Sequence, residues 1–302
     1  MNCSLLITGA SGLLGRPLLR ACAAQPGWRV TGTAFRRTGP GLANIDLSQT
    51  EQIPAFLDGI APDVIIHAAA ERHPDVSEKD PSGTQRLNVG ATAVLAQWAA
   101  ARHAFLIYIS TDYVFDGTTP PYSPADATHP VNAYGQSKLD GERAVLASGA
   151  DHAILRVPIL YGEVETLDES PVTVLAKNML KARPGERLAM ENWATRYPTH
   201  TGDVAAVLRQ MVAHKFSHPD LSGTFHWSGD EPMTKYDMAL ALAQLVGFAP
   251  DRLVPDATPP TGAPRPKDAH LDTAELERLG IGRRTPFASA LPAILAPYLR
   301  RV

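Results

Sequence analysis

The sequence predicts an α/β protein built on a doubly wound parallel sheet, with a smaller, interleaved C-terminal part. Two observations carry this prediction. A short apolar run, Leu5–Ile7, is followed by a glycine-rich turn and a helix whose apolar residues suit packing on a sheet. Strand-like segments then alternate with helices up to residue 109, which favours parallel strands with right-handed crossovers. Ligands of such sheets bind outside the carboxyl ends of the strands.

The remaining segments are expected in chain order. In the first half of the chain, the pattern predicts strands at 28–35, 42–47, 64–67 and 105–109, and helices at 49–60 and 84–102. The second half predicts a strand at 153–157, helices at 172–180 and 203–212, an irregular turn at 197–200 and a strand at 223–229 that rejoins the sheet. A helix opened by a Thr234 cap at 234–247, a proline-rich loop at 255–266 and a last helix at 287–299 complete the chain.

This order predicts two interleaved units. Residues 1–157, rejoined by 197–229, are expected to form the cofactor-binding unit, and residues 158–196 and 230–302 the substrate-binding part.

Composition narrows the class of protein. With 302 residues and a net charge of −3, the chain has no basic block for nucleic acid or a membrane surface. No apolar run approaches the roughly 20 residues that span a bilayer, and the N-terminus lacks the pattern of a signal peptide. Two cysteines are too few for a disulfide framework. We therefore expect a cytoplasmic protein with a small-molecule substrate.

Three glycines form the turn between the first strand and the first helix. Gly9, Gly12 and Gly15 follow one another at intervals of three residues, and glycines there let backbone N–H groups approach a pyrophosphate at the helix N-terminus. About 20 residues further on, where an acidic residue would bind the ribose of NAD, the chain has Arg36 and Arg37. Arginines grip a 2′-phosphate, so NADP is favoured over NAD. The alternatives are a glycine turn without a ligand and two solvated arginines.

Three residues predict the chemistry. Thr111 stands at the end of the fifth strand, and Tyr134 and Lys138 are four apart, on one face of a helix. A nearby ammonium is expected to lower the pKa of the phenol, whose usual value near 10 suits catalysis poorly. The predicted reaction is hydride transfer to a ketone with Tyr134 as the proton donor. The alternative is a surface pair on a helix.

Other chemistries find no support. The chain has no G-x-S-x-G turn for a serine hydrolase. Its histidines and cysteines predict no metal site.

The glycine spacing and the Tyr134/Lys138 pair resemble the extended short-chain dehydrogenase/reductases, which have a Rossmann-like fold. Within them, the stretches 110–115, 134–142 and 265–266 resemble dTDP-4-dehydrorhamnose reductase. That resemblance implies reduction of the 4-keto group of a nucleotide sugar with NADPH or NADH, by Thr111, Tyr134 and Lys138. The chain departs from that pattern at Ile159, where those reductases usually have a tryptophan near the sugar.

Longer stretches are similar to the regulatory β subunit of methionine adenosyltransferase, of the same superfamily branch. They are 35–37, 69–72, 158–165, 223–229 and 233–236. This resemblance implies NADP binding and, as the alternative function, a non-catalytic regulatory subunit whose partner is the methionine adenosyltransferase catalytic subunit.

The motifs and the resemblance together define the predicted site. The catalytic residues are Thr111, Tyr134 and Lys138. The cofactor-binding residues, which include that Tyr/Lys pair, are Thr8, Gly9, Ser11, Gly12, Leu13, Leu14, Gly15, Phe35, Arg36, Arg37, Asp46, Leu47, His67, Ala68, Ala69, Ala70, Asn88, Ile109, Val157 and Pro158. The substrate residues, with Thr111 again, are Glu71, Asp112, Tyr113, Ile159, Trp193, Arg196 and Arg265, and Tyr197 is a further candidate.

Overall fold

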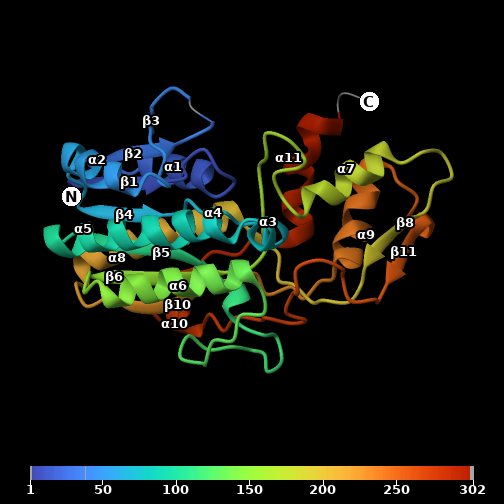
Figure 1. Ribbon diagram of the computed structural model, residues 1–302. Helices are drawn as coiled ribbons and strands as arrows, with labels where there is room; N and C mark the ends of the chain where they lie inside the picture. The colour runs from blue at the N-terminus through green and yellow to red at the C-terminus, as the bar shows by residue number, and fades with distance from the viewer. Residues whose placement is uncertain (1, 38, 300–302) are drawn as a thin grey trace.

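A seven-stranded parallel sheet forms the centre of the molecule (Figure 1). The computed structural model describes residues 2–37 and 39–299, so the ends of the two predicted units, residues 1 and 300–302, lie outside the described residues. The strand order is β10-β6-β5-β4-β1-β2-β3, and every neighbouring pair is parallel. The strands are β1 (Cys3–Thr8), β2 (Trp28–Ala34), β3 (Leu42–Asn44), β4 (Val64–His67), β5 (Phe105–Thr111), β6 (His152–Val157) and β10 (Gly223–His226).

Helices cover both faces of this sheet. Alternate residues of the inner strands face opposite layers, so that Leu5 and Ile7 pack with α8 while Leu6 packs with α2 and α5. One layer holds α1 (Gly15–Ala23), α8 (Thr201–Ser217) and α10 (Ala274–Arg278), and the other α2 (Ile53–Ile60), α5 (Ala91–Arg102) and α6 (Ala133–Ala147). The doubly wound α/β fold predicted from the alternating pattern is confirmed.

The predicted strand at 223–229 joins the sheet, because β10 pairs with β6 at its edge. The third strand is shorter than predicted: it ends at Asn44, after which the Asp46 carboxylate accepts hydrogen bonds from the backbone and hydroxyl of Ser48. This local bonding turns the chain away from the sheet.

The helical run after β4 begins earlier than predicted. It consists of α3 (Pro74–Lys79), α4 (Pro81–Gln85), a π-helical turn η2 (Arg86–Gly90) and α5. Proline occupies the first turn of both α3 and α4, where its missing N–H costs little. The Asp80 side chain caps α4 by accepting from the Gly83 N–H, 2.9 Å away.

A second lobe lies beyond the carboxyl ends of the strands, on the right of Figure 1. Its helices are α7 (Thr173–Lys181), α9 (Lys235–Val246) and α11 (Phe287–Leu299), and its strands pair as β8 (Leu188–Glu191) with β11 (Leu253–Asp256) and β7 (Leu160–Tyr161) with β9 (Thr199–His200). Thr234 and Asp237 form a capping box at the start of α9, and the predicted Thr234 cap is confirmed. Short 3₁₀ turns are η1 (Thr50–Gln52), η3 (Asp112–Val114) and η4 (Pro250–Arg252).

Within the described ranges, no helix combines the length and apolar character that a membrane span requires.

Candidate active site

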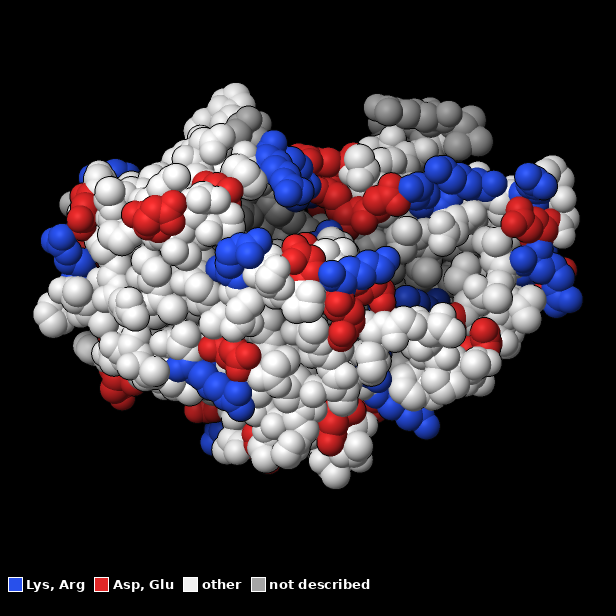
Figure 2. Space-filling view, in the orientation of Figure 1, with Lys and Arg blue, Asp and Glu red and all other residues white. Residues whose placement is uncertain are grey.

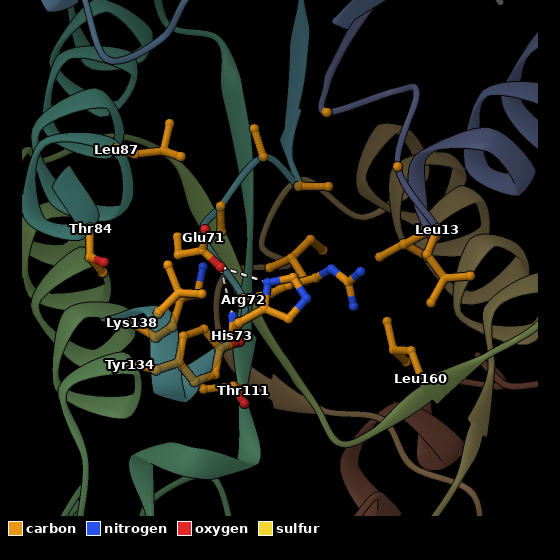
Figure 3. Close-up of a pocket in the computed structure, with 18 of the residues that line it drawn as sticks. Leu13, Glu71, Arg72, His73, Thr84, Leu87, Thr111, Tyr134, Lys138 and Leu160 are labelled. Atoms are coloured by element: carbon orange, nitrogen blue, oxygen red, sulfur yellow. Dashed lines mark hydrogen bonds and ion pairs between the residues drawn. The ribbon is translucent and has the colours of Figure 1, made fainter. Parts of the chain in front are cut away.

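A cleft of about 960 Å³ opens between the carboxyl ends of the strands and the second lobe. Figure 3 shows its two walls: Thr111, Tyr134 and Lys138 lie on one side, Leu13 and Leu160 on the other, with Arg72 and His73 between them. Most residues that the sequence predicted for the site line this cleft. They are Gly9, Ser11, Gly12, Leu13, Leu14, Gly15, Phe35, Arg36, Arg37, Asp46, Leu47, Ala68, Ala69, Ala70, Glu71, Ile109, Thr111, Asp112, Tyr113, Tyr134, Lys138, Val157, Pro158, Ile159, Arg196 and Arg265.

The glycine turn is packed against its own backbone. A Cβ on Gly15 would lie 2.1 Å from the Gly9 carbonyl oxygen, and one on Gly9, whose φ is +67°, would lie 2.9 Å from the Ala69 backbone. Only glycine fits at these two positions. The turn leads into α1, whose first turn, all within the described residues, carries no acidic side chain. A helix N-terminus beside such a turn fits the pyrophosphate of a dinucleotide.

Three predicted cofactor residues lie behind the lining and support it. The Thr8 hydroxyl oxygen accepts hydrogen bonds from the Ala68 and Ala69 N–H groups, each 3.1 Å away, and lies 2.7 Å from His67 Nδ1. Burial lowers the pKa of His67 to about 3, so its ring is neutral. The Asn88 amide bonds both the N–H and the C=O of Glu71. These residues position the backbone after β4.

The two arginines after β2 have different environments. The Arg36 guanidinium lies 5.9 Å from the centre of the Phe35 ring and forms no ion pair among the described residues. Arg37, by contrast, pairs with Glu169 of the second lobe. Sequence reasoning did not predict this partner.

The catalytic candidates converge at the end of β5. Thr111 lies beside Tyr134 in the cleft, and its hydroxyl donates to an Asp112 carboxylate oxygen 3.0 Å away. Lys138, one helical turn after Tyr134, is buried, and its ammonium nitrogen lies 4.0 Å from the centre of the Tyr108 ring.

The expected lowering of the phenol pKa is not found. Burial raises the pKa of Tyr134, while the Thr111 hydrogen bond and the charge of Arg72 act against that rise. Burial also lowers the pKa of Lys138 to about 7, against the opposing charge of Glu142. Tyr134 and Lys138 both lie in α6 and line the cleft, as their spacing predicts, but the helix places both groups in a desolvated environment. Tyr134 is therefore a protonated phenol at neutral pH.

The far end of the cleft carries several cations. Arg196 pairs with Glu191 at 2.6 Å, and Arg265 pairs with Asp75 at 2.7 Å. Lys235, at the start of α9, also lines the cleft and was not predicted, although it follows directly on the recognised Thr234 cap. Trp193 does not line the cleft, and neither does Tyr197, which stacks on His270 at 4.0 Å.

Two histidines near the end of α8 have the H-x-x-x-H spacing that can bind a metal. His214 and His218 stack at the end of α8, with ring centroids 4.1 Å apart. Within residues 2–37 and 39–299, no third His, Cys, Asp or Glu completes a metal-binding group.

Asp112 predicts a pH-dependent stability. Its burial raises its pKa from 3.8 to about 7, although the Thr111 hydroxyl opposes this. Below about pH 4 both states are protonated; as the pH rises to about 7 the unfolded state ionises first, so the free energy of unfolding falls. Asp112→Asn cannot ionise, so this pH-dependent fall in the free energy of unfolding is removed. We expect its stability advantage over the wild type to grow between about pH 4 and pH 7 and then level off, as measured by urea denaturation. An advantage independent of pH would contradict the assignment.

Comparisons with known proteins agree with this geometry. The model of the RmlD substrate binding domain family matches residues 3–300. The mouse protein "Methionine adenosyltransferase 2 subunit beta" is 48% identical over 97% of this chain and 87% of that protein. The "dTDP-4-dehydrorhamnose reductase" of Aggregatibacter actinomycetemcomitans is 30% identical over 91% of this chain and 92% of that protein.

A solved structure shares the fold. The Bacillus anthracis dTDP-4-dehydrorhamnose reductase, crystallised in complex with NADP, superposes with a TM-score of 0.83 at 24% identity, covering 98% of this chain and all of that chain. The chain therefore belongs to the RmlD substrate binding domain family, among the extended short-chain dehydrogenase/reductases.

Proposed function

We propose that this protein is an NADP-dependent reductase that reduces a keto group of a nucleotide sugar. The observation that carries the proposal is the meeting of Thr111, Tyr134 and Lys138 in the same cleft as the glycine turn. A strand-end hydroxyl, a phenol and an amine beside a nucleotide-binding turn are the groups that ketone reduction needs.

Each residue has a separate role. The nicotinamide, when bound, supplies the hydride. The protonated phenol of Tyr134 donates a proton to the substrate oxygen, and the raised pKa keeps that proton in place at neutral pH. Thr111 lies beside the phenol, and its hydroxyl, which donates to Asp112, would turn to donate to the same substrate oxygen. Lys138 would bind the nicotinamide ribose and, when charged, stabilise the phenolate that remains.

The cofactor preference rests on the residues after β2. Arg36 and Arg37 line the cleft at the position where the ribose phosphate of NADP would be held, and Asp46 and Leu47 line it at the adenine end. The Bacillus anthracis reductase of the same fold was crystallised with NADP. NAD, which lacks the 2′-phosphate, is the weaker candidate.

The substrate proposal rests on charge. Arg196, Arg265 and Lys235 line the far end of the cleft, and the first two already face carboxylates. A diphosphate would therefore bind most directly to Lys235. The residues 158–196 and 230–302 would then form the substrate-binding part, except for α10, which packs on the central sheet.

The assay is NADPH oxidation in the presence of a dTDP-4-keto-6-deoxy sugar, followed by the loss of absorbance of the reduced nicotinamide. We expect turnover above the rate without the sugar, and faster turnover with NADPH than with NADH. Tight NADPH binding without turnover of this or related nucleotide-sugar ketones would contradict the reductase function.

A second candidate function has its own support. The chain is 48% identical to a mouse protein named as the β subunit of methionine adenosyltransferase 2, across nearly its whole length. We propose as the alternative a non-catalytic, NADP-binding regulatory subunit that associates with the methionine adenosyltransferase catalytic subunit. Co-elution with that enzyme at micromolar concentration, together with a change in its kinetics, would support this function.

The two described cysteines are buried and unpaired, which fits the reducing cytoplasm for either function.

A further inference from the structure

A loop of the second lobe closes one side of the cofactor end of the cleft. This loop, residues 162–172, connects β7 to α7 and is called the strap below. It contributes Val164 and Leu167 to the same apolar cluster as Leu13 of the glycine turn. Its residues Asp168, Ser170 and Pro171 line the cleft. The strap therefore lies against the part of the chain that would hold the pyrophosphate.

Ion pairs hold the strap to the cofactor-binding side. Glu169 receives two hydrogen bonds from Arg16, of 3.1 and 2.7 Å, and also pairs with Arg37. Arg16 and Arg37 additionally approach Glu165, at 3.7 and 3.5 Å. The basic and acidic groups that adjoin at the upper centre of Figure 2 lie where the strap passes in Figure 1. Attraction between opposite charges thus fastens the strap.

Glu169 is at the centre of this network. Its side chain is only 10% exposed, whereas that of Arg37 is 50% exposed. Its backbone oxygen accepts a hydrogen bond of 2.8 Å from Arg72. Burial acts to raise the pKa of Glu169, but the hydrogen bonds from Arg16 and the Glu165 N–H and the two arginine charges outweigh it and lower the pKa. The carboxylate is ionised at neutral pH.

We propose that Glu169 is a specificity-determining residue, whose carboxylate competes with the 2′-phosphate of NADP(H) for Arg37. The inference rests on the proposed function, because it assumes that the cleft binds NADP(H). Arg36, which forms no ion pair among the described residues, can bind the 2′-phosphate without breaking one. Arg37 must instead exchange or share its carboxylate partner. Glu169 therefore reduces the preference for NADPH over NADH while it fastens the strap.

The test is a nucleotide-binding measurement on Glu169→Gln, which keeps the size of the side chain and removes its charge. We expect the dissociation constant for NADPH to fall about fivefold and that for NADH to stay within twofold, in line with a partly exposed ion pair. Fluorescence titration with each reduced nucleotide measures both constants, and no catalytic turnover is needed. Glu169→Asp, which withdraws the carboxylate but keeps the strap anionic, should give a smaller change in the same direction.

Glu163→Gln is the matched control. Glu163 belongs to the same strap and its loss changes the net charge equally, but it pairs with Arg20 at an exposed rim and not with Arg37. Its ratio of NADH to NADPH dissociation constants should equal that of the wild type. In a protein that already carries Arg37→Gln, Glu169→Gln should no longer change the ratio, because the contested cation is gone.

The possible failures are distinguishable. If the wild type binds NADPH but Glu169→Gln leaves the ratio unchanged or lowers it, the competition is disproved and the proposed cofactor stands. If Glu163→Gln raises the ratio equally, the effect is one of general charge and the inference fails. If the wild type binds neither nucleotide, the proposed function and this inference fail together.

Discussion

Replacing Tyr134 with phenylalanine is expected to lower kcat for ketone reduction by about 10³-fold, within the range for loss of a general acid. The phenol lies beside Thr111 at the end of β5, in the same described cleft as the glycine turn. NADPH affinity should change by less than about twofold, because the ring itself remains. Steady-state kinetics for kcat and fluorescence titration for NADPH affinity separate the two effects.

Tyr161→Phe is the control for this change. The Tyr161 hydroxyl is buried, lies outside the cleft lining and has no hydrogen-bond partner in the described structure. Its removal should leave kcat unchanged. Wild-type turnover by Tyr134→Phe would show that the proton comes from another group and would overturn the role proposed for Tyr134.

The largest stability effect is expected at the buried pair between α6 and β6. Arg156 donates to both carboxylate oxygens of Glu142, at 2.9 and 2.7 Å, and the two side chains are 6% and 2% exposed. Ser110 also donates to Glu142. Glu142→Gln leaves the arginine charge buried and poorly compensated, so we expect a loss of about 3–5 kcal/mol in the free energy of unfolding. Urea denaturation measures it.

Two comparisons test this expectation. Arg143→Gln breaks an exposed pair with Asp140 on the same helix and should cost less than about 1 kcal/mol. A double variant, Glu142→Met with Arg156→Met, should be more stable than the sum of the single losses predicts, because no uncompensated charge remains. A cost below about 1 kcal/mol for Glu142→Gln would mean that water or another group solvates Arg156.

Much of the cofactor end could be predicted from local sequence. Leu5–Ile7 is an apolar run with a glycine turn directly after it, and both the strand and the turn follow from neighbouring residues. The parallel sheet follows from the alternation of such runs with helices, and β10 joins β6 as expected. By contrast, β7 and β9 have two residues each, too few to give a pattern.

The site departs from prediction where distant residues meet. The place of Arg37 after β2 predicts a phosphate partner, but Glu169, with which it pairs, lies 132 residues further along the chain. Spacing put Lys138 on the same face as Tyr134 and gave no measure of desolvation, which controls both pKa values. The sequence around Lys235 indicates only the start of a helix, since the neighbours of Lys235 in the cleft come from other segments.

Leu13 gives the two lobes a mechanical connection. It belongs to the glycine turn, yet it packs in the apolar cluster of the second lobe with Val164 and Leu167. A hinge motion of that lobe would pull on Leu13, and through it on the backbone amides at the start of α1. Opening the cleft to release product would thus distort the backbone that would bind the pyrophosphate. Product release and weakening of nucleotide binding would then be coupled.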